Sequence, residues 1–95
     1  MVSVSPVVID SSSAAAIVNI RGYNFDKLDE MGVTYQVKEN GEVVAEEFLT
    51  CQMLSAETAS GDFGGVPAQG IALEIKEVYG ILLESYDRVT LWQSN

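Results

Sequence analysis

Hydrophobic and polar residues alternate along much of the chain with the two-residue period of a β-strand. In segment 16–21 the even-numbered residues are all apolar, whereas the opposite face is mostly polar. Segment 2–9 is rich in β-branched residues, and Pro6 confines it to a sheet edge or a bulge because proline cannot donate a ladder hydrogen bond. The pattern predicts strands in both segments and a further strand at 88–92.

The clearest local signal is a hairpin in the middle of the chain. Segment 33–38 alternates between apolar and polar residues, and a second apolar run begins at Val43. Between them lies Asn40-Gly41, and both residues tolerate the positive φ angles that a type I′ turn requires. This arrangement predicts two antiparallel strands joined at Asn40-Gly41.

Segment 71–86 is compatible with two structures. Its apolar residues alternate at first, as in a strand, but several also fall on one face of a helix. Gly80 disfavours a helix by about 1 kcal/mol relative to alanine, and the β-branched residues of the segment also favour a strand. A strand is therefore the favoured interpretation, and a helix remains the alternative.

These elements predict one domain over residues 1–95. The favoured fold class is mainly β, a small antiparallel sandwich or barrel of six to seven short strands. If segment 71–86 is helical, the fold becomes α+β, with that helix packed on a sheet. The aromatic residues are mostly spaced as core or half-buried strand residues.

The charge balance limits the classes of partner. Fourteen acidic and five basic residues give a net charge of −9, which repels nucleic acid phosphates and anionic membranes. We expect protein partners, with no direct contact to nucleic acid or membrane. The first residues lack the basic and apolar regions of a secretory signal, which predicts a cytoplasmic or virion protein.

Residues for catalysis are scarce. The chain has no histidine, the commonest general base and metal ligand, and Cys51 lies in an apolar run that predicts a buried, inert thiol. Glu46 and Glu47 are adjacent, so on a strand their carboxylates would point to opposite faces. The sequence predicts a protein that is not an enzyme, with no catalytic residues, no cofactor and no metal site.

Protein contact is the chemistry that remains. The glycine-rich stretch 60–70 is either mobile or shaped by what it touches, and a tryptophan near one end of the chain either closes the core or anchors a partner. Adjacent glutamates would attract a basic surface. The predicted interaction residues are Gly61, Asp62, Phe63, Gly64, Gly65, Glu46, Glu47 and Trp92.

Three functions are compatible with these features. We expect a structural or assembly protein, a small subunit of a larger particle such as a bacteriophage capsid, neck or tail component, which binds copies of itself or other subunits. One alternative is an acidic inhibitor or decoy that occupies the basic groove of a nucleic-acid-binding protein. The other is a small ligand-binding β module.

Overall fold

Eight β-strands and one short 3₁₀ helix make up the structure, a computed structural model that describes residues 1–94. All strand pairs are antiparallel, and they form a nearly closed, barrel-like sheet in the order β1-β3-β6-β5-β4-β7-β2. Strand β8 pairs with β7 on the same side as β2, further along β7. The elements are β1 (Ser3–Ser5), β2 (Val8–Asp10), β3 (Ile17–Arg21), η1 (Phe25–Lys27), β4 (Leu28–Glu39), β5 (Glu42–Met53), β6 (Thr58–Asp62), β7 (Ile71–Leu82) and β8 (Arg88–Gln93). The mainly β fold class is confirmed.

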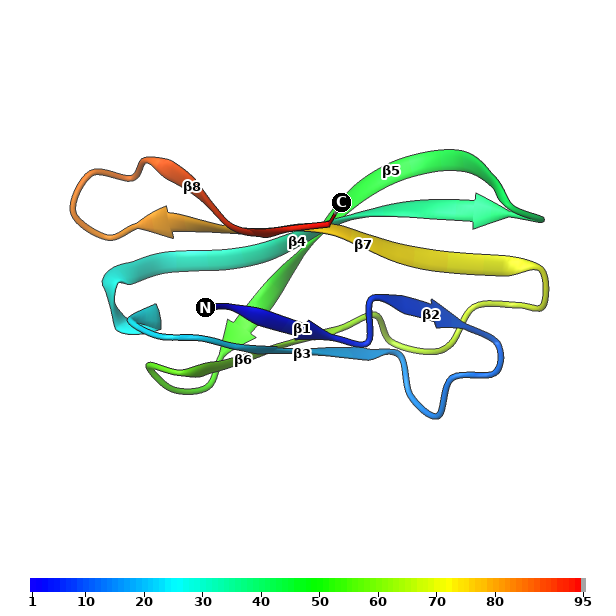
Figure 1. The fold of residues 1–95 in the computed structure, drawn as a ribbon, viewed down its shortest axis with the longest axis horizontal. Coiled ribbons are helices and arrows are strands. Elements are labelled where there is room, and N and C mark those ends of the chain that lie inside the picture. Colours follow the sequence, from blue (N-terminus) through cyan, green and yellow to red (C-terminus); the bar gives the residue numbers. More distant parts are fainter. Residues whose placement is uncertain (95) are drawn as a thin grey trace.

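The barrel has two layers, one formed by β1, β3 and β6 and the other by β2, β4, β7 and β8. Two segments connect these layers. Strand β5 pairs with β4 over most of its length and with β6 only at Gln52 and Met53, so it crosses from one layer to the other (Figure 1). On the opposite side, β1 pairs with β3 and β2 pairs with β7, and a cis peptide bond at Ser5-Pro6 separates the two short strands. The division at Pro6 agrees with the edge position predicted from the sequence.

The core lies between the two layers. It contains Val18 and Ile20 of β3, which are fully buried, as the alternation in segment 16–21 predicted. The other layer contributes residues of β4 and β7. The remaining buried members are Phe25, Leu28, Met31, Val33, Cys51, Ala59, Ile75 and Val78.

A β-bulge explains why segment 71–86 resembled a helix. Tyr35 of β4 pairs with Ile75, and the preceding Thr34 pairs with Glu77, which leaves Lys76 without an opposing residue. The extra residue shifts the alternation of β7, so both Ile75 and Val78 face the core with a helix-like spacing of three. The favoured interpretation as a strand is confirmed up to Leu82.

The asparagine–glycine hairpin is confirmed as well. Asn40 and Gly41 have φ angles of 52° and 88° and join β4 to β5. The expectation of short strands was wrong for β4, β5 and β7, each of which has twelve residues. The structure also contains a strand, β6, at the start of the stretch 60–70.

Candidate protein-interaction surface

The long edge of β5 is the most prominent unpaired feature of the sheet. Within residues 1–94, the ten residues Glu42–Cys51 pair with β4 on one side and with no strand on the other. Figure 1 shows this part of β5 as an arc at the rim of the molecule. Ten residues of strand span about 33 Å, and alternate residues of an antiparallel edge direct their N–H and C=O groups outward. We call Glu42–Cys51 the open β5 edge.

The edge is open because β6 is short and turns away from β5. The backbone N–H of Phe63, just after β6, donates to the carbonyl of Ala16, 2.9 Å away. The Phe63 ring packs edge-on against Tyr35, with ring centroids 4.9 Å apart. Gly64 then turns the chain with a φ of 90°, and its N–H donates to the Asp62 carboxylate at 2.8 Å. The pairing of β6 with β5 ends at Ser60, and these contacts hold the following residues near the start of β3.

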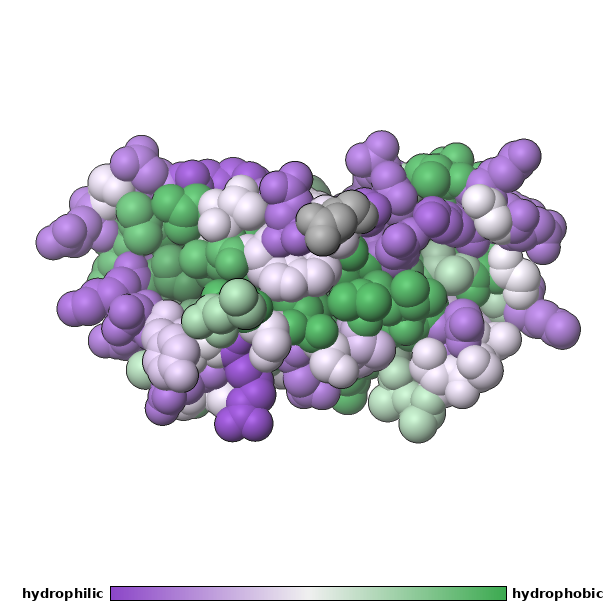
Figure 2. Space-filling model, in the orientation of Figure 1, coloured by the Kyte–Doolittle hydropathy of each residue, from purple (hydrophilic) through white to green (hydrophobic). Residues whose placement is uncertain are grey.

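Exposed apolar side chains lie along this edge. The exposed fractions of Val43, Val44 and Phe48 are 48%, 55% and 69%. A register shift in the β4–β5 ladder leaves Val44 unpaired, so both valines are exposed although they are adjacent. Figure 2 shows hydrophobic surface over β5 bordered by hydrophilic residues. The open β5 edge therefore offers backbone hydrogen-bonding groups and apolar contact area together.

The same edge is acidic on both faces. Glu46 is paired with Gln36 of β4, and Glu47 is paired with Tyr35, so the two carboxylates belong to opposite faces, as the sequence predicted. The sequence between residues 42 and 53 contains three glutamates and no lysine or arginine. The pKa of Tyr35 is raised, first by burial and then by the negative charge of Glu47.

A platform of interacting side chains, Thr34, Glu77, Tyr79 and Arg88, adjoins Phe48 on the outer face of the sheet. A shallow hollow of about 220 Å³ is lined by Phe48, Thr34, Tyr79 and Arg88. The Arg88 guanidinium lies 4.6 Å from the centroid of the Tyr79 ring, and its two terminal nitrogens donate to the Glu77 carboxylate at 2.7 and 3.2 Å. The paired side chains of Glu77, Tyr79 and Arg88 therefore continue the surface that begins with Phe48.

Charge pairing sets the pKa values on this platform. The pKa of Glu77 is lowered, chiefly by the hydrogen bonds from Arg88 and then by the one from the Thr90 hydroxyl at 2.6 Å. The pKa of Arg88 is raised by its hydrogen bonds to Glu77. The pair is therefore charged at neutral pH.

The structure divides the predicted interaction residues between different places. Glu46 and Glu47 lie on the open β5 edge, whereas Gly61 is buried, and a Cβ at that position would meet Val18, Cys51 and Leu49 within 3.3 Å. Phe63 is half-buried against Tyr35. The exposed members of the glycine stretch border a separate shallow hollow of about 390 Å³, with Asp62, Gly64 and Gly65 in its lining.

Trp92 contributes to the core. Its side chain is half-buried and packs against the hydrophobic core, and β8 pairs its backbone with Val78 of β7. The sequence left open whether this tryptophan closes the core or docks on a partner, and its position agrees with the first of these roles.

The exposed apolar residues of the edge were not predicted from the sequence. Phe48 was grouped with core or half-buried aromatics, and that assignment was wrong, as it was for Tyr23 and Tyr86, which are 67% and 68% exposed. The available signal was the pair Val43-Val44, because two adjacent apolar residues break the strand period and indicate a bulge or an exposed edge.

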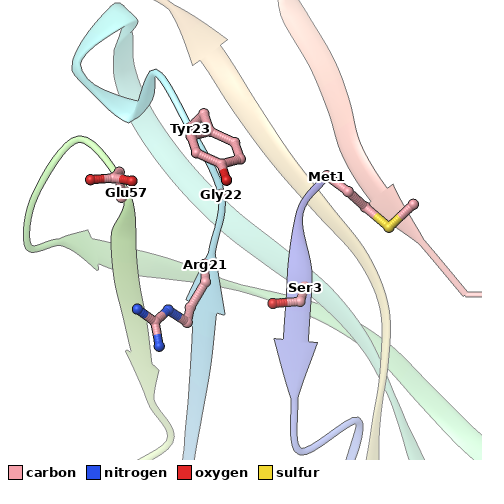
Figure 3. A pocket seen from close by; sticks show the side chains of 6 residues that line it. All are labelled: Met1, Ser3, Arg21, Gly22, Tyr23 and Glu57. Atoms are coloured by element: carbon pink, nitrogen blue, oxygen red, sulfur yellow. The ribbon is translucent and has the colours of Figure 1, made fainter.

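A third hollow lies near the start of the chain and is exposed. Its volume is about 260 Å³, and Figure 3 shows its lining residues, which belong to β1 and the residues before it, to the end of β3 and the two residues after it, and to the turn before β6. They do not converge on one point, and the Met1 side chain extends away from those of Arg21 and Glu57 (Figure 3). Gly22 is the one buried lining residue among Met1, Ser3, Arg21, Gly22, Tyr23 and Glu57.

A metal site and a reactive thiol have little support among the residues that the structure describes. Residues 1–94 contain no group of three or more histidine, cysteine or acidic residues placed to hold a metal ion. Burial raises the pKa of the Cys51 thiol to about 11, so the thiol is protonated at neutral pH. The described residues include no helix of the length and hydrophobicity needed to cross a membrane.

The acidic residues near β4 form two separate groups. Asp26, Asp29 and Glu30 lie near the start of β4, and Glu39 and Glu42 lie at its other end. Eight residues of β4, 31–38, lie between Glu30 and Glu39, and the longest dimension of the molecule is 41 Å.

Comparison of the chain with known protein families, curated proteins and solved structures gave no match.

Proposed function

We propose that this domain is a non-enzymatic assembly protein that joins a larger particle by accepting a strand along the open β5 edge. The observation that carries the proposal is the ten-residue length of β5 that has a strand partner on one side only. In β-strand addition, a partner chain satisfies the free N–H and C=O groups of such an edge, and side-chain contacts supply the specificity.

The other edge strands of the described sheet are much shorter. Strands β1 and β2 have three residues each and β8 has six. Proteins commonly shorten or cover their edges because a long free edge recruits other chains. A long edge with three exposed apolar side chains is the expected form of an edge that has a partner in its working state.

We include in this proposal the type of particle expected from the sequence, a bacteriophage capsid, neck or tail. Its support is indirect: the domain is small, strand-rich and acidic. The alternative of an acidic decoy would need Asp26, Asp29 and Glu30 to act together with Glu39 and Glu42, and the two groups lie at opposite ends of β4.

Light scattering tests whether the open β5 edge associates. At low salt the acidic copies repel one another, whereas at about 1 M salt the screening length falls to about 3 Å and this repulsion is removed. We expect wild-type mass to rise with concentration at high salt. The double variant V44K/F48K should remain monomeric, because lysine on an edge blocks strand pairing.

A matched control places two lysines elsewhere. Leu83 and Tyr86 in the β7–β8 loop are 51% and 68% exposed, so L83K/Y86K makes the same change in charge and removes similar apolar surface. This variant should associate like the wild type. An equal loss in both variants would overturn the proposed function, and so would a wild-type chain that neither associates at high salt and high concentration nor binds an extended peptide along β5.

A further inference from the structure

We infer that the strand accepted by the open β5 edge is a basic one: an extended segment of another protein with two adjacent lysine or arginine residues opposite Glu46 and Glu47. This inference rests on the proposed function and names the partner of that same edge. It depends on the charge of the edge, on the pairing of the cations in this chain and on the order of side chains along β5.

The negative charge of the edge is not neutralised from within the described chain. The three ion pairs among residues 1–94 join Lys38 and Lys76 to Glu74, and Arg88 to Glu77. Lys38 lies directly opposite Val43 in the β4–β5 ladder, yet its partner is on β7, on the other side of β4. The glutamates of the edge are therefore left to interact with whatever strand is added there.

A second copy of this chain is a poor occupant. Pairing two open β5 edges would place six glutamates in one two-stranded interface, since each copy contributes Glu42, Glu46 and Glu47. Each copy also carries a net charge of −9. Like charges across a strand pair are destabilising, so the open β5 edges of two copies repel each other and self-association is disfavoured.

The order of side chains defines the sequence that the edge would accept. Phe48 and Glu46 share the outer face with Thr34 and Gln36, whereas Glu47 shares the inner face with Tyr35. An antiparallel partner therefore places an apolar residue opposite Phe48, then two basic residues opposite Glu47 and Glu46. Apolar residues opposite Val44 and Val43 would follow after one further position.

Two synthetic probes test this inference directly. The basic probe is a fluorescently labelled nine-residue peptide of threonine and valine with two adjacent lysines after an apolar residue, and the acidic probe has glutamates in their place. Binding is measured by fluorescence anisotropy at low salt. We expect the wild-type chain to bind the basic probe at least about tenfold more tightly, because two cross-strand charge pairs change from repulsive to attractive.

Charge reversal should exchange the preference. The variant E46K/E47K is expected to bind the acidic probe more tightly than the basic one. The matched control E84K/D87K makes the same change in net charge in the β7–β8 loop, where both residues are exposed. It should keep the preference of the wild type, and an equal loss in both variants would show a general charge effect and overturn the inference.

A modified probe separates strand addition from simple charge attraction. Methylation of alternate amides removes the donors from one edge of the peptide, so one of the two methylation patterns should abolish binding and the other should not. Equal binding of both modified probes would overturn the inference. So would low-salt dimers that the basic probe cannot displace, because a second copy would then be the occupant.

The two proposals fail separately. If the chain associates through β5 at high salt but shows no preference between the probes, the basic partner is wrong and the assembly function stands. If neither association nor probe binding occurs, both are wrong.

Discussion

The ring of Tyr79 on β7 lies across the backbone of Gly32, its cross-strand partner on β4, and a Cβ on residue 32 would fall 2.5 Å from Cζ of that ring. Tyr79 is only 7% exposed although it belongs to the outer face of the sheet. The absence of a side chain at Gly32 creates the space for the ring, and the Arg88 guanidinium covers it from the other direction.

The variant Gly32→Ala should destabilise the domain. The added methyl group displaces the Tyr79 ring and disturbs its contact with Arg88, and overpacking of this kind costs about 1–3 kcal/mol. Urea unfolding measures the change in the free energy of unfolding. Gly65→Ala is the control, because no described atom lies within 4 Å of its Cβ position and its φ is not positive. Equal effects of the two variants would show that the ring does not require Gly32.

The Glu77–Arg88 pair should make stability depend on acid pH. Because the pKa of Glu77 is lowered in the folded state, the pair stabilises the fold above the ordinary glutamate pKa of 4.5, and this stabilisation is lost as the pH falls through the lowered value. Arg88 is partly exposed, so we expect at most about 1 kcal/mol at pH 7. The difference in unfolding free energy between wild type and Glu77→Gln should shrink between pH 6 and pH 3. Arg88→Met should show the same trend, and a difference that grows toward acid pH would contradict the assignment.

Cys51 should react with thiol reagents only when the structure opens. Its side chain is 8% exposed, and burial raises its pKa to about 11, so little thiolate exists at pH 8. We expect labelling by a chromogenic disulfide to be slow in the native state and to accelerate with urea as local and global opening increase. The chain has one cysteine, so the signal reports this position alone. Fast labelling without denaturant would place the thiol at an accessible site.

Local patterns predicted the parts of the fold that depend on neighbouring residues. The hairpin at Asn40-Gly41 and the buried face of β3 follow from turn chemistry and alternation, which need no knowledge of the rest of the chain. The bulges between β4 and β7 gave no comparable local signal in the sequence. At the start of β4, Leu28 and Glu30 pair with adjacent residues of β7 and leave Asp29 unopposed, an irregularity that no local pattern indicates.

The candidate surface was only partly predictable for a different reason. Glu46 and Glu47 were selected because adjacent charges are conspicuous in a sequence. The exposure of Phe48 depends on which face of β5 points outward and on whether a strand lies beside β5 at that point, and both are long-range properties of the sheet. An aromatic residue in a strand is equally compatible with a core and with a free edge until that neighbour is known.

Phe48 should contribute to docking and not to stability, in contrast to Phe25. Phe48 is 69% exposed and Phe25 is 2% exposed. Truncation of a buried phenylalanine costs about 3–5 kcal/mol, whereas an exposed position usually changes stability by less than about 0.5 kcal/mol. We therefore expect Phe48→Ala to unfold at the same urea concentration as the wild type, and Phe25→Ala to be strongly destabilised.

The same Phe48→Ala variant should weaken strand addition. Anisotropy with the basic probe is expected to show a loss of about fivefold to tenfold, because the apolar residue of the probe loses its cross-strand neighbour. Val66→Ala provides the comparison, since Val66 is 42% exposed and lies in the connection between β6 and β7, away from the edge residues 42–51. If Phe48→Ala instead lowers stability and leaves probe binding unchanged, then Phe48 serves the fold, and the partner does not contact this part of β5.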